Sequence, residues 1–317
     1  MPPAPKVSLR RLKERDLDIA DTIVRTAFGT LWNLPEPSKA FGDREMLRNR
    51  WRASPSSAFA AFVDGELVGV NLATRWGSYA FFGPLAVRPD FWGKGIGGKL
   101  VEPVMRLFSK WDISHASLFT FADSPKHVGL YHKFGFHARF LTQVMVKQVG
   151  KTTAGSDLVL LSSLGERRQK GVLADCRQLT GRLYPGLDLT NEILASLRGR
   201  FGETVLIFDE STVRGFAVCH IGAGTEAGSG RLFVKFGAVR PGVDSPTAFR
   251  SLLDACEAVG GERGVKTLEA GVNLARSRAY EAMLGGGFRA DFQGVVMDKP
   301  NSPAYNRPDV FVVDDLR

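Results

Sequence analysis

The sequence has few cysteines and no long apolar run. Its three cysteines, Cys176, Cys219 and Cys256, are odd in number and far apart. This pattern disfavours a disulfide framework and a zinc site, so we expect reduced thiols, a cytoplasmic protein and no metal. No stretch approaches the roughly 18 consecutive apolar residues of a membrane span. The start, MPPAPKVSLRRLKERD, is too charged for a signal peptide, so secretion is disfavoured as well.

Acidic residues are scarce in the first half of the chain. Residues 1–150 contain 21 Lys and Arg against 13 Asp and Glu, whereas residues 151–317 contain 21 against 20. The excess positive charge favours a phosphate-bearing ligand in the first half. The basic residues are dispersed and are not interleaved with aromatic side chains, which disfavours nucleic acid as a partner. At 317 residues the chain is more typical of two domains than of one.

The stretch FFGPLAVRPDFWGKGIGGKL, from Phe81 to Leu100, has the pattern of a strand, a glycine turn and a helix. Seven mostly apolar residues form the strand, Arg88-Pro89 ends it, and apolar residues then recur at helical spacing as far as Phe108. Glycines let backbone N–H groups converge on one point, and the helix start adds unpaired N–H groups and partial positive charge. The pattern predicts an anion site, with phosphate as the natural ligand.

Two general phosphate-binding patterns fit this turn incompletely. Gly93 to Gly98 matches G-x-G-x-x-G, but Arg88 to Trp92 separates it from the strand that it should follow directly. Gly93 to Lys99 matches G-x-x-x-x-G-K, but Leu100 stands where a hydroxyl residue would hold magnesium. A nucleoside triphosphatase is therefore disfavoured.

A third pattern fits better. V-R-P followed by W-G-K-G-I-G-G-K-L resembles the acyl-CoA loop of the GNAT (Gcn5-related) N-acetyltransferase family, [RQ]-x-x-G-x-[GA]. On that motif Trp92 replaces the Arg or Gln, and Gly95 and Gly97 take the two small positions. The segment SPKHVGLYHKFGF resembles the second family signature, N-x-x-A-x-x-L-Y-x-x-x-G-F, with Ser124 in place of Asn and His127 in place of the small residue.

The resemblance implies a fold, a co-substrate and a set of site residues. The fold is α/β (α+β), in which each GNAT domain is a mixed, mostly antiparallel, splayed sheet flanked by helices. The co-substrate is acetyl-CoA, bound mainly by backbone N–H groups of the loop. The implied cofactor-binding residues are Leu85, Ala86, Val87, Trp92, Gly93, Lys94, Gly95, Ile96, Gly97, Gly98, Ser124 and Tyr131.

Gly83-Pro84 lies inside the apolar strand. Proline has no N–H for the sheet ladder, so pairing must be interrupted there, and a bulge or splay is predicted. A widened gap to the next strand, Ala116 to Ala122, would admit the pantetheine arm and expose the backbone near Leu85 and Val87.

The chemistry of acyl transfer needs a base for the amine and is helped by an acid for the leaving thiolate. Tyr131 fits the acid. No carboxylate lies in the two flanking strands, so Asp123, His127 and a water molecule are the alternatives for the base. The remaining histidines considered, His115, His132 and His137, are interpreted as surface residues.

The order of elements recurs after a linker of the composition GKTTAGS, residues 150–156. A hairpin at Phe201 to His220 repeats the one at Ala58 to Thr74, and Asn273 to Tyr280 repeats the seven-residue spacing of Ser124 to Tyr131. We therefore expect an internal duplication, with an N-terminal CoA-binding domain at 1–150 and a C-terminal degenerate domain at 151–317.

The glycine loop is not copied. In its place stands Gly242-Val243-Asp244-Ser245-Pro246-Thr247, where Ser245 is interpreted as a helix N-cap and Pro246 as the first helical residue. One CoA site per chain is therefore predicted.

The favoured function is an acetyl-CoA-dependent N-acetyltransferase that acts on a primary amine of a small molecule or peptide, by direct attack in a ternary complex. The alternative is a non-catalytic acyl-CoA-binding or assembly protein. A homo-oligomer is compatible with the sequence.

Overall fold

The computed structural model describes residues 6–150 and 158–317, so most of the predicted linker, residues 151–156, lies outside the described residues. The helices are α1 (Leu17–Leu31), α2 (Met46–Ala53), α3 (Ile96–Trp111), α4 (Pro125–His132), α5 (Glu166–Leu183), α6 (Thr190–Gly199), α7 (Ser245–Glu262) and α8 (Ser277–Gly285). The strands are β1 (Val7–Arg11), β2 (Ala58–Val63), β3 (Glu66–Trp76), β4 (Tyr79–Val87), β5 (His115–Thr120), β6 (His137–Gln148), β7 (Leu158–Leu160), β8 (Gly202–Asp209), β9 (Thr212–Gly222), β10 (Gly228–Val239), β11 (Thr267–Asn273), β12 (Arg289–Lys299) and β13 (Val312–Val313).

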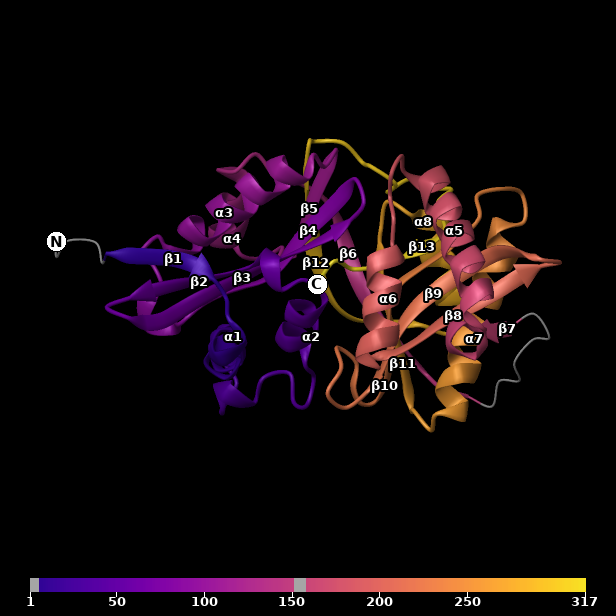
Figure 1. The fold of residues 1–317 in the computed structure, drawn as a ribbon, viewed down its shortest axis with the longest axis horizontal. Coiled ribbons are helices and arrows are strands. Elements are labelled where there is room, and N and C mark those ends of the chain that lie inside the picture. Colours follow the sequence, from indigo (N-terminus) through magenta and orange to yellow (C-terminus); the bar gives the residue numbers. More distant parts are fainter. Residues whose placement is uncertain (1–5, 151–157) are drawn as a thin grey trace.

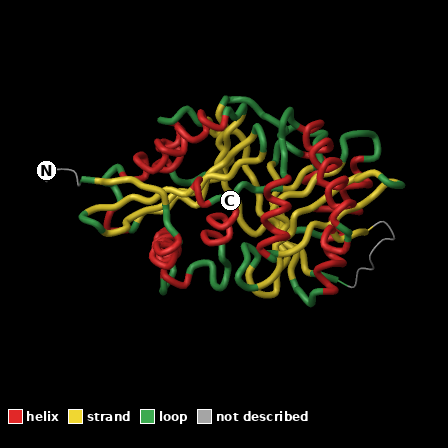
Figure 2. The backbone as a smooth tube through the Cα atoms, viewed as in Figure 1, coloured by secondary structure: helices red, strands yellow, loops and turns green. Residues whose placement is uncertain are grey.

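These strands form one continuous mixed sheet with helices on both faces (Figures 1 and 2). Its order is β1-β2-β3-β4-β5-β12-β6-β11-β10-β9-β8-β7, and β13 pairs with β10. Within the described residues, β4–β5 and β10–β11 are the parallel pairs, and the other pairs are antiparallel. The predicted mixed, mostly antiparallel sheet flanked by helices is confirmed.

The same order of elements occurs twice along the chain. One strand, two helices, three strands, a helix, a strand, a helix and a final strand run from β1 to β6 and again from β7 to β12. The final strands are exchanged: β12 pairs with β5, and β6 pairs with β11. Because each half needs the other's last strand as a neighbour, the two halves are interlocked at the centre of the sheet (Figure 1).

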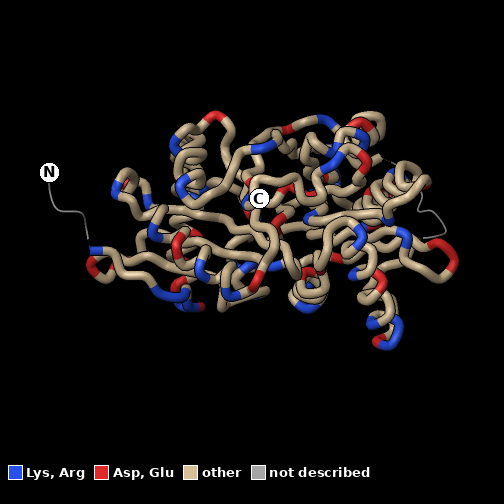
Figure 3. Tube along the Cα trace, turned by 90° about the horizontal axis from the view of Figure 1, so that it is seen from above, with Lys and Arg blue, Asp and Glu red and all other residues tan. Residues whose placement is uncertain are grey.

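Helices cover the sheet because each presents one apolar stripe to it. In the first half, α3 packs on one face through Leu100, Val104 and Phe108, and α4 joins it there through Tyr131, while α1 and α2 pack on the other face. None of the described helices is long and apolar enough to cross a membrane. Lysine and arginine are interspersed with aspartate and glutamate along both halves (Figure 3).

A buried charge cluster joins the halves beside the middle of the sheet. Arg50 of α2 donates from Nη2 to Glu226 Oε2 over 2.7 Å, and Lys235 Nζ bonds Glu226 Oε1 over 2.7 Å and Glu192 over 2.9 Å. Each of these side chains is less than a tenth exposed. Arg50 also donates from Nη1 to the carbonyl of Gly83 over 2.9 Å, so the cluster reaches β4 at its interruption.

We expect Glu226→Gln to destabilise the whole protein. Removing Glu226 leaves Arg50 without its buried carboxylate and Lys235 with Glu192 alone, so one buried positive charge is uncompensated, which costs about 3–5 kcal/mol. Denaturant unfolding followed by circular dichroism measures this loss. The control is Glu36→Gln, whose partner Lys39 is 72% exposed and which should change stability little. Equal, small effects of the two substitutions would contradict the role of the cluster.

Candidate active site

The sheet opens at the predicted interruption in β4. The β3–β4 register shifts between Phe82 and Leu85, so that Gly83 and Pro84 have no partners on β3. On its other side, β4 pairs with β5 only through Tyr79–Phe81 against His115–Ser117. Beyond Phe81 the β5 side of β4 is therefore left without a strand neighbour, and the predicted splay is present.

The open edge of β4 presents backbone groups. Because backbone direction alternates along a strand, Leu85 and Val87 face the opening while Ala86 faces β3. The Val87 carbonyl accepts a 2.6 Å hydrogen bond from Trp92 Nε1. Trp92, which departs from the family motif, thus closes the loop back onto β4, and Lys126 Nζ lies 5.4 Å from the centroid of its ring.

The glycine turn leads directly into α3. Gly93 and Gly95 have φ angles of 78° and 75°, the left-handed region that favours glycine. Gly97 and Gly98 lie in the first turn of α3, where a Cβ atom would come within 3.4 and 3.8 Å of Leu130. The first N–H groups of a helix have no partner within it, so this turn offers several donors and a positive dipole end to an anion.

One cavity of about 1070 Å³ connects these features. Among the predicted cofactor-binding residues, Lys94 does not line it; its Nζ lies 4.4 Å from the centroid of the Phe91 ring. The other eleven line the cavity: Leu85, Ala86, Val87, Trp92, Gly93, Gly95, Ile96, Gly97, Gly98, Ser124 and Tyr131. The second half supplies further lining residues that the sequence did not single out: Glu269, Asp291, Phe292, Gln293, Leu316 and Arg317.

Tyr131 lies on α4 with its side chain buried against the wall of this cavity. It is 6% exposed and makes an edge contact with Phe82 at 5.7 Å between ring centroids. Burial raises the pKa of the Tyr131 hydroxyl, and a hydrogen bond with the Thr120 side chain partly opposes this rise. The hydroxyl therefore stays protonated through the neutral pH range, as a proton donor requires.

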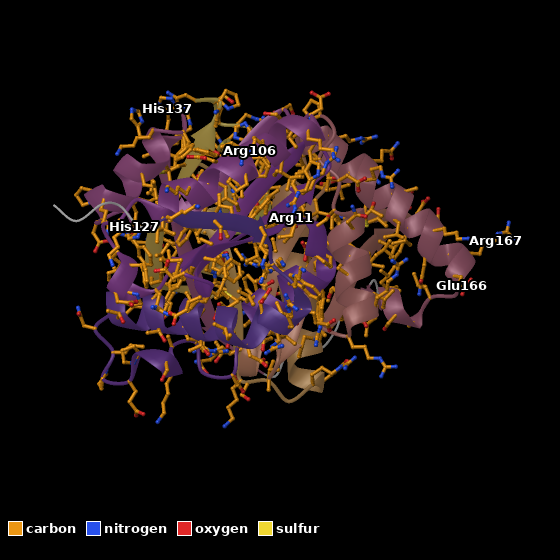
Figure 4. All side chains as sticks on the ribbon, turned by 60° about the vertical axis from the view of Figure 1, so that its left-hand side comes forward. Arg11, Arg106, His127, His137, Glu166 and Arg167 are labelled. Atoms are coloured by element: carbon orange, nitrogen blue, oxygen red, sulfur yellow. The ribbon has the colours of Figure 1, made fainter. Side chains whose placement is uncertain are left out.

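His127 lies one helical turn before Tyr131 and lines the same cavity. Figure 4 labels it on the outer side of the first half. Its Nδ1 is 2.6 Å from Ser124 Oγ, and its ring is 5.6 Å from that of Phe121. Burial lowers the pKa of His127, and the charge of Lys126 lowers it further, while Asp123 opposes them. A neutral imidazole that donates Nδ1–H to Ser124 leaves Nε2 free to accept a proton.

The cavity carboxylate Glu269 is unsuited to act as a base. Burial alone would raise its pKa, but Arg317 and Arg44 lower the pKa to about 2. Arg44 Nη2 and Arg317 Nη2 each lie 2.7 Å from the Glu269 carboxylate. Glu269 is therefore ionised and already hydrogen-bonded at neutral pH.

The interpretation of His115 as a surface residue is wrong. His115 is 1% exposed, and its Nε2 lies 3.0 Å from Asp298 Oδ1 on β12. Its partner Asp298 lies far away in the sequence, on the exchanged strand β12, so the burial of His115 could not be predicted from the residues around it. Among the described residues no group of three or more His, Cys, Asp or Glu side chains is placed to hold a metal ion.

In the second half, a segment of the chain fills the corresponding opening. β13 pairs with Gly237 and Ala238 of β10, just beyond the four residues of β10 that pair with β11. Arg276, at the position that corresponds to His127, donates to the Val312 carbonyl over 2.8 Å and pairs with Asp314 over 3.0 Å. Residues 312–314 thus pair with the edge of β10 and with Arg276, where the first half leaves the edge of β4 open.

The predicted N-cap role of Ser245 is wrong. Ser245 is the first residue of α7, Asp244 precedes it as N-cap, and neither side chain caps the helix. Ser245 Oγ lies 2.9 Å from the Arg240 carbonyl and 2.7 Å from that of Gly242, so the hydroxyl donates backwards into the turn. In this half the opening in the sheet is closed by β13 rather than by a capped helix.

Comparison with known proteins is decisive for the first half. The sequence model of the acetyltransferase (GNAT) family matches residues 24–136, which include the splay, the glycine turn and Tyr131. Residues 24–136 are a GNAT-family domain. The GNAT family uses acetyl-CoA as its acyl donor. A comparison with curated protein sequences finds no match to the chain.

Solved structures resemble the whole chain. A putative acetyltransferase from Pyrococcus horikoshii is 15% identical, with a TM-score of 0.69 over 96% of this chain and 93% of that one. A GCN5-related N-acetyltransferase from Sphaerobacter thermophilus is 16% identical, with a TM-score of 0.62 over 92% and 95%. The glucosamine N-acetyltransferase region of a fungal β-N-acetylglucosaminidase is 10% identical, with a TM-score of 0.65 over 93% and 38%. At these identities the likeness shows the fold.

We expect the protein to bind one CoA, and Gly95→Val to abolish that binding. Valine is strained at a φ of 75°, and its side chain would stand in the anion site. Calorimetry with CoA should give a stoichiometry near one for the unsubstituted protein.

The matched control is Gly264→Val, which has a φ of 69° and equally open surroundings but lies away from the cavity. It should bind CoA as the unsubstituted protein does. If Gly95→Val keeps its affinity for CoA, or if the unsubstituted protein binds two CoA molecules, the prediction of one CoA site at the glycine turn is contradicted.

Proposed function

We propose that this chain transfers an acetyl group from acetyl-CoA directly to a primary amine of a small molecule or peptide, in a ternary complex. The carrying observation is the single cavity that joins the glycine turn, the open edge of β4, Tyr131 and His127. An anion site, a free strand edge and two proton-transfer groups are the parts that thioester aminolysis needs.

The residues present fit the cofactor in three places. The N-terminus of α3 would hold the pyrophosphate, and Lys126 and Lys133, which line the cavity, would add positive charge. The backbone of Leu85 and the N–H of Val87 would pair with the pantetheine amides. Bound there, acetyl-CoA supplies an activated carbonyl carbon.

The protein's own groups would manage the two protons. His127 would take one from the attacking ammonium, so that the neutral amine can form the new C–N bond. As the C–S bond breaks, Tyr131 would donate its proton to the leaving thiolate. The second proton of the acylated nitrogen would pass to solvent, from which Tyr131 would recover one, so that the products are the amide, the CoA thiol and one net proton. Buried as it is, the phenol provides a fixed hydrogen-bond donor where negative charge develops.

We propose further that residues 1–150 and 151–317 are two copies of one domain, and that the second copy binds no cofactor. The repeated order of elements and the filled opening beside β10 support this division.

The proposed function is tested by measuring turnover of acetyl-CoA with a panel of amines. The substitution Tyr131→Phe tests whether this phenol is the proton donor to the leaving thiolate. Removing the hydroxyl should lower kcat by about 10²–10⁴-fold with CoA affinity almost intact. The matched control is Tyr280→Phe at the equivalent position of the second half, which should leave kcat unchanged. CoA binding without turnover of any amine would favour the non-catalytic alternative, and an unaffected Tyr131→Phe would make water the donor.

The pH profile tests His127. A base must be neutral to act, so kcat/KM should fall on the acid side with an apparent pKa below the ordinary histidine value of about 6.5. With an acceptor whose own pKa lies well above that of histidine, the amine stays an ammonium ion throughout this limb, so amine ionisation does not set its position. His127→Gln should remove the limb and most of the rate, whereas His137→Gln, outside the cavity, should alter neither. If His127→Gln keeps both the acid limb of kcat/KM and the full rate, His127 is not the base, and Asp123 or water takes that role.

A further inference from the structure

Arg44 lies at the end of the cavity away from the glycine turn. Arg50 donates to the carbonyl of Gly83, near the start of the opening in β4, and pairs with the Glu226 carboxylate. Arg44 Nη1 in turn lies 3.4 Å from the Glu226 carbonyl oxygen. Val87, at the other end of the opening, is the residue that leads towards the glycine turn. Hydrogen bonds thus connect Arg44 to the end of the opening that is farther from the phosphate-binding loop.

The Glu269 carboxylate beside Arg44 is shared by three arginines. Its Oε1 lies 3.0 Å from Arg44 Nη1 and 2.7 Å from Arg317 Nη2. Its Oε2 lies 2.7 Å from Arg44 Nη2 and 2.9 Å from Arg231 Nη1. A carboxylate has about four acceptor sites, so Glu269 is saturated. Within residues 6–150 and 158–317, the second carboxylate that pairs with these arginines is Asp315, 2.9 Å from Arg317 Nε.

The side-chain charges of this arginine cluster, which consists of Arg44, Arg231 and Arg317, do not cancel. Three positive charges pair with two negative ones, so one positive charge is left over. Asp291 also lines the cavity, but it is exposed and makes no ion pair in the part of the chain that the structure describes. Water screens such a carboxylate, whereas Arg44 and Arg317 are only 19% and 16% exposed. The arginine cluster therefore favours an anionic group.

Arg317 has a guanidinium that is held in place and a nitrogen without a partner. Its Cζ lies 4.6 Å from the centroid of the Phe233 ring and 5.8 Å from that of Phe292. Its Nη2 and Nε are used by Glu269 and Asp315, while among the described residues Nη1 has no hydrogen-bond partner. Arg317 lines the cavity. A fixed guanidinium with free N–H groups is suited to bind a carboxylate.

Aromatic side chains connect the arginine cluster to the proton donor. Phe292, which contacts Arg317, lies 6.0 Å from Phe119 between ring centroids. Phe119 precedes Thr120 on β5, and the Thr120 side chain bonds the Tyr131 hydroxyl. An acceptor that reaches both ends of this path would lie against aromatic rings.

A second aromatic wall leads from the base. Phe121 lies 5.6 Å from His127 and 6.1 Å from Phe28 between ring centroids, and Phe28 lies 5.2 Å from Phe41. Trp32 contacts both Phe28 and Phe41 and is 41% exposed, although it lines the cavity. Aromatic surface left open in a cavity favours a ligand with an apolar body.

We propose that the acceptor is an amine that also carries an apolar body and a carboxylate, and that the arginine cluster binds this carboxylate through Arg317. This rests on the proposed function and adds the class of acceptor to it. One carboxylate would balance the one positive charge that is left over, and the apolar body would lie against the aromatic walls. The second half of the chain would then determine acceptor specificity, because it supplies two of the three arginines.

A matched series of acceptors tests this proposal. Apolar amino acids with the amine at increasing distance from the carboxylate are each compared with their own carboxamide, which has a similar shape but no negative charge. We expect the best amino acid to bind the CoA-loaded protein about tenfold more tightly than its carboxamide, because hydrogen bonds to charged groups are stronger than those to neutral ones. Calorimetry measures the binding, and this comparison needs no variant to fold.

The substitution Arg317→Gln should reduce the preference for the carboxylate to about one. It removes both the charge that is left over and the free N–H groups. Arg317→Lys keeps the charge without the planar fork and should retain part of the preference. The matched control is Arg177→Gln, which breaks an ion pair with Asp188 outside the cavity and should keep the preference. The same ratio in kcat/KM is compared between proteins, so the difference in pKa between the two amines cancels.

Measuring binding and turnover side by side separates this proposal from the function on which it rests. A carboxylate preference in binding that Arg317→Gln abolishes, without turnover of any amine, would support the arginine cluster and contradict the transferase function. Turnover without a preference for the carboxylate, or a preference that persists in Arg317→Gln, would overturn the proposal while the transferase function stands.

Discussion

The missing N–H of Pro84 is the constraint on which the site depends. A strand in the middle of a sheet normally has both edges paired, and β4 loses its pairing on both sides at Gly83 and Pro84. The opening that results leaves the backbone beyond it free to pair with a ligand. The freed Gly83 carbonyl is held by Arg50, whose charge is balanced by Glu226 of the other half. The opening is therefore supported across the interface and is more than a local break.

The corresponding opening in the second half is filled by a segment of the chain. There β10 also separates from β11 after four residues, but β13 pairs with the freed edge and Arg276 fastens that segment through Asp314. An unpaired strand edge inside a protein leaves backbone groups without hydrogen bonds, so it needs either a ligand or a piece of chain. Within residues 6–150 and 158–317, a cavity lies beside the open edge of β4, whereas a segment of chain pairs with the corresponding edge of β10.

The parts of the structure that could be predicted from the sequence are those set by local chemistry. Proline at residue 84, the glycines from Gly93 to Gly98 and the spacing from Ser124 to Tyr131 act through their neighbours in the chain, so strand, turn and helix follow from them. Strand exchange could not be predicted, because the residues of β6 and β12 carry no mark of which half they join. For the same reason Asp291 and Glu269 were missed: they reach the cavity only through that exchange.

Strand exchange also gives the second half a structural part in the cavity beside β4. β12 is the neighbour of β5, so without it the strand that carries Thr120 to the cavity would have an open edge. The segment that closes the second opening continues to Leu316 and Arg317, which line the first cavity, and Arg317 helps to hold Glu269 in its ionised form. Closing one opening therefore builds a wall of the other. Because β13 is held against β10, the residues that follow it are directed to this wall, so the closed opening beside β10 and the shape of the cavity beside β4 are linked.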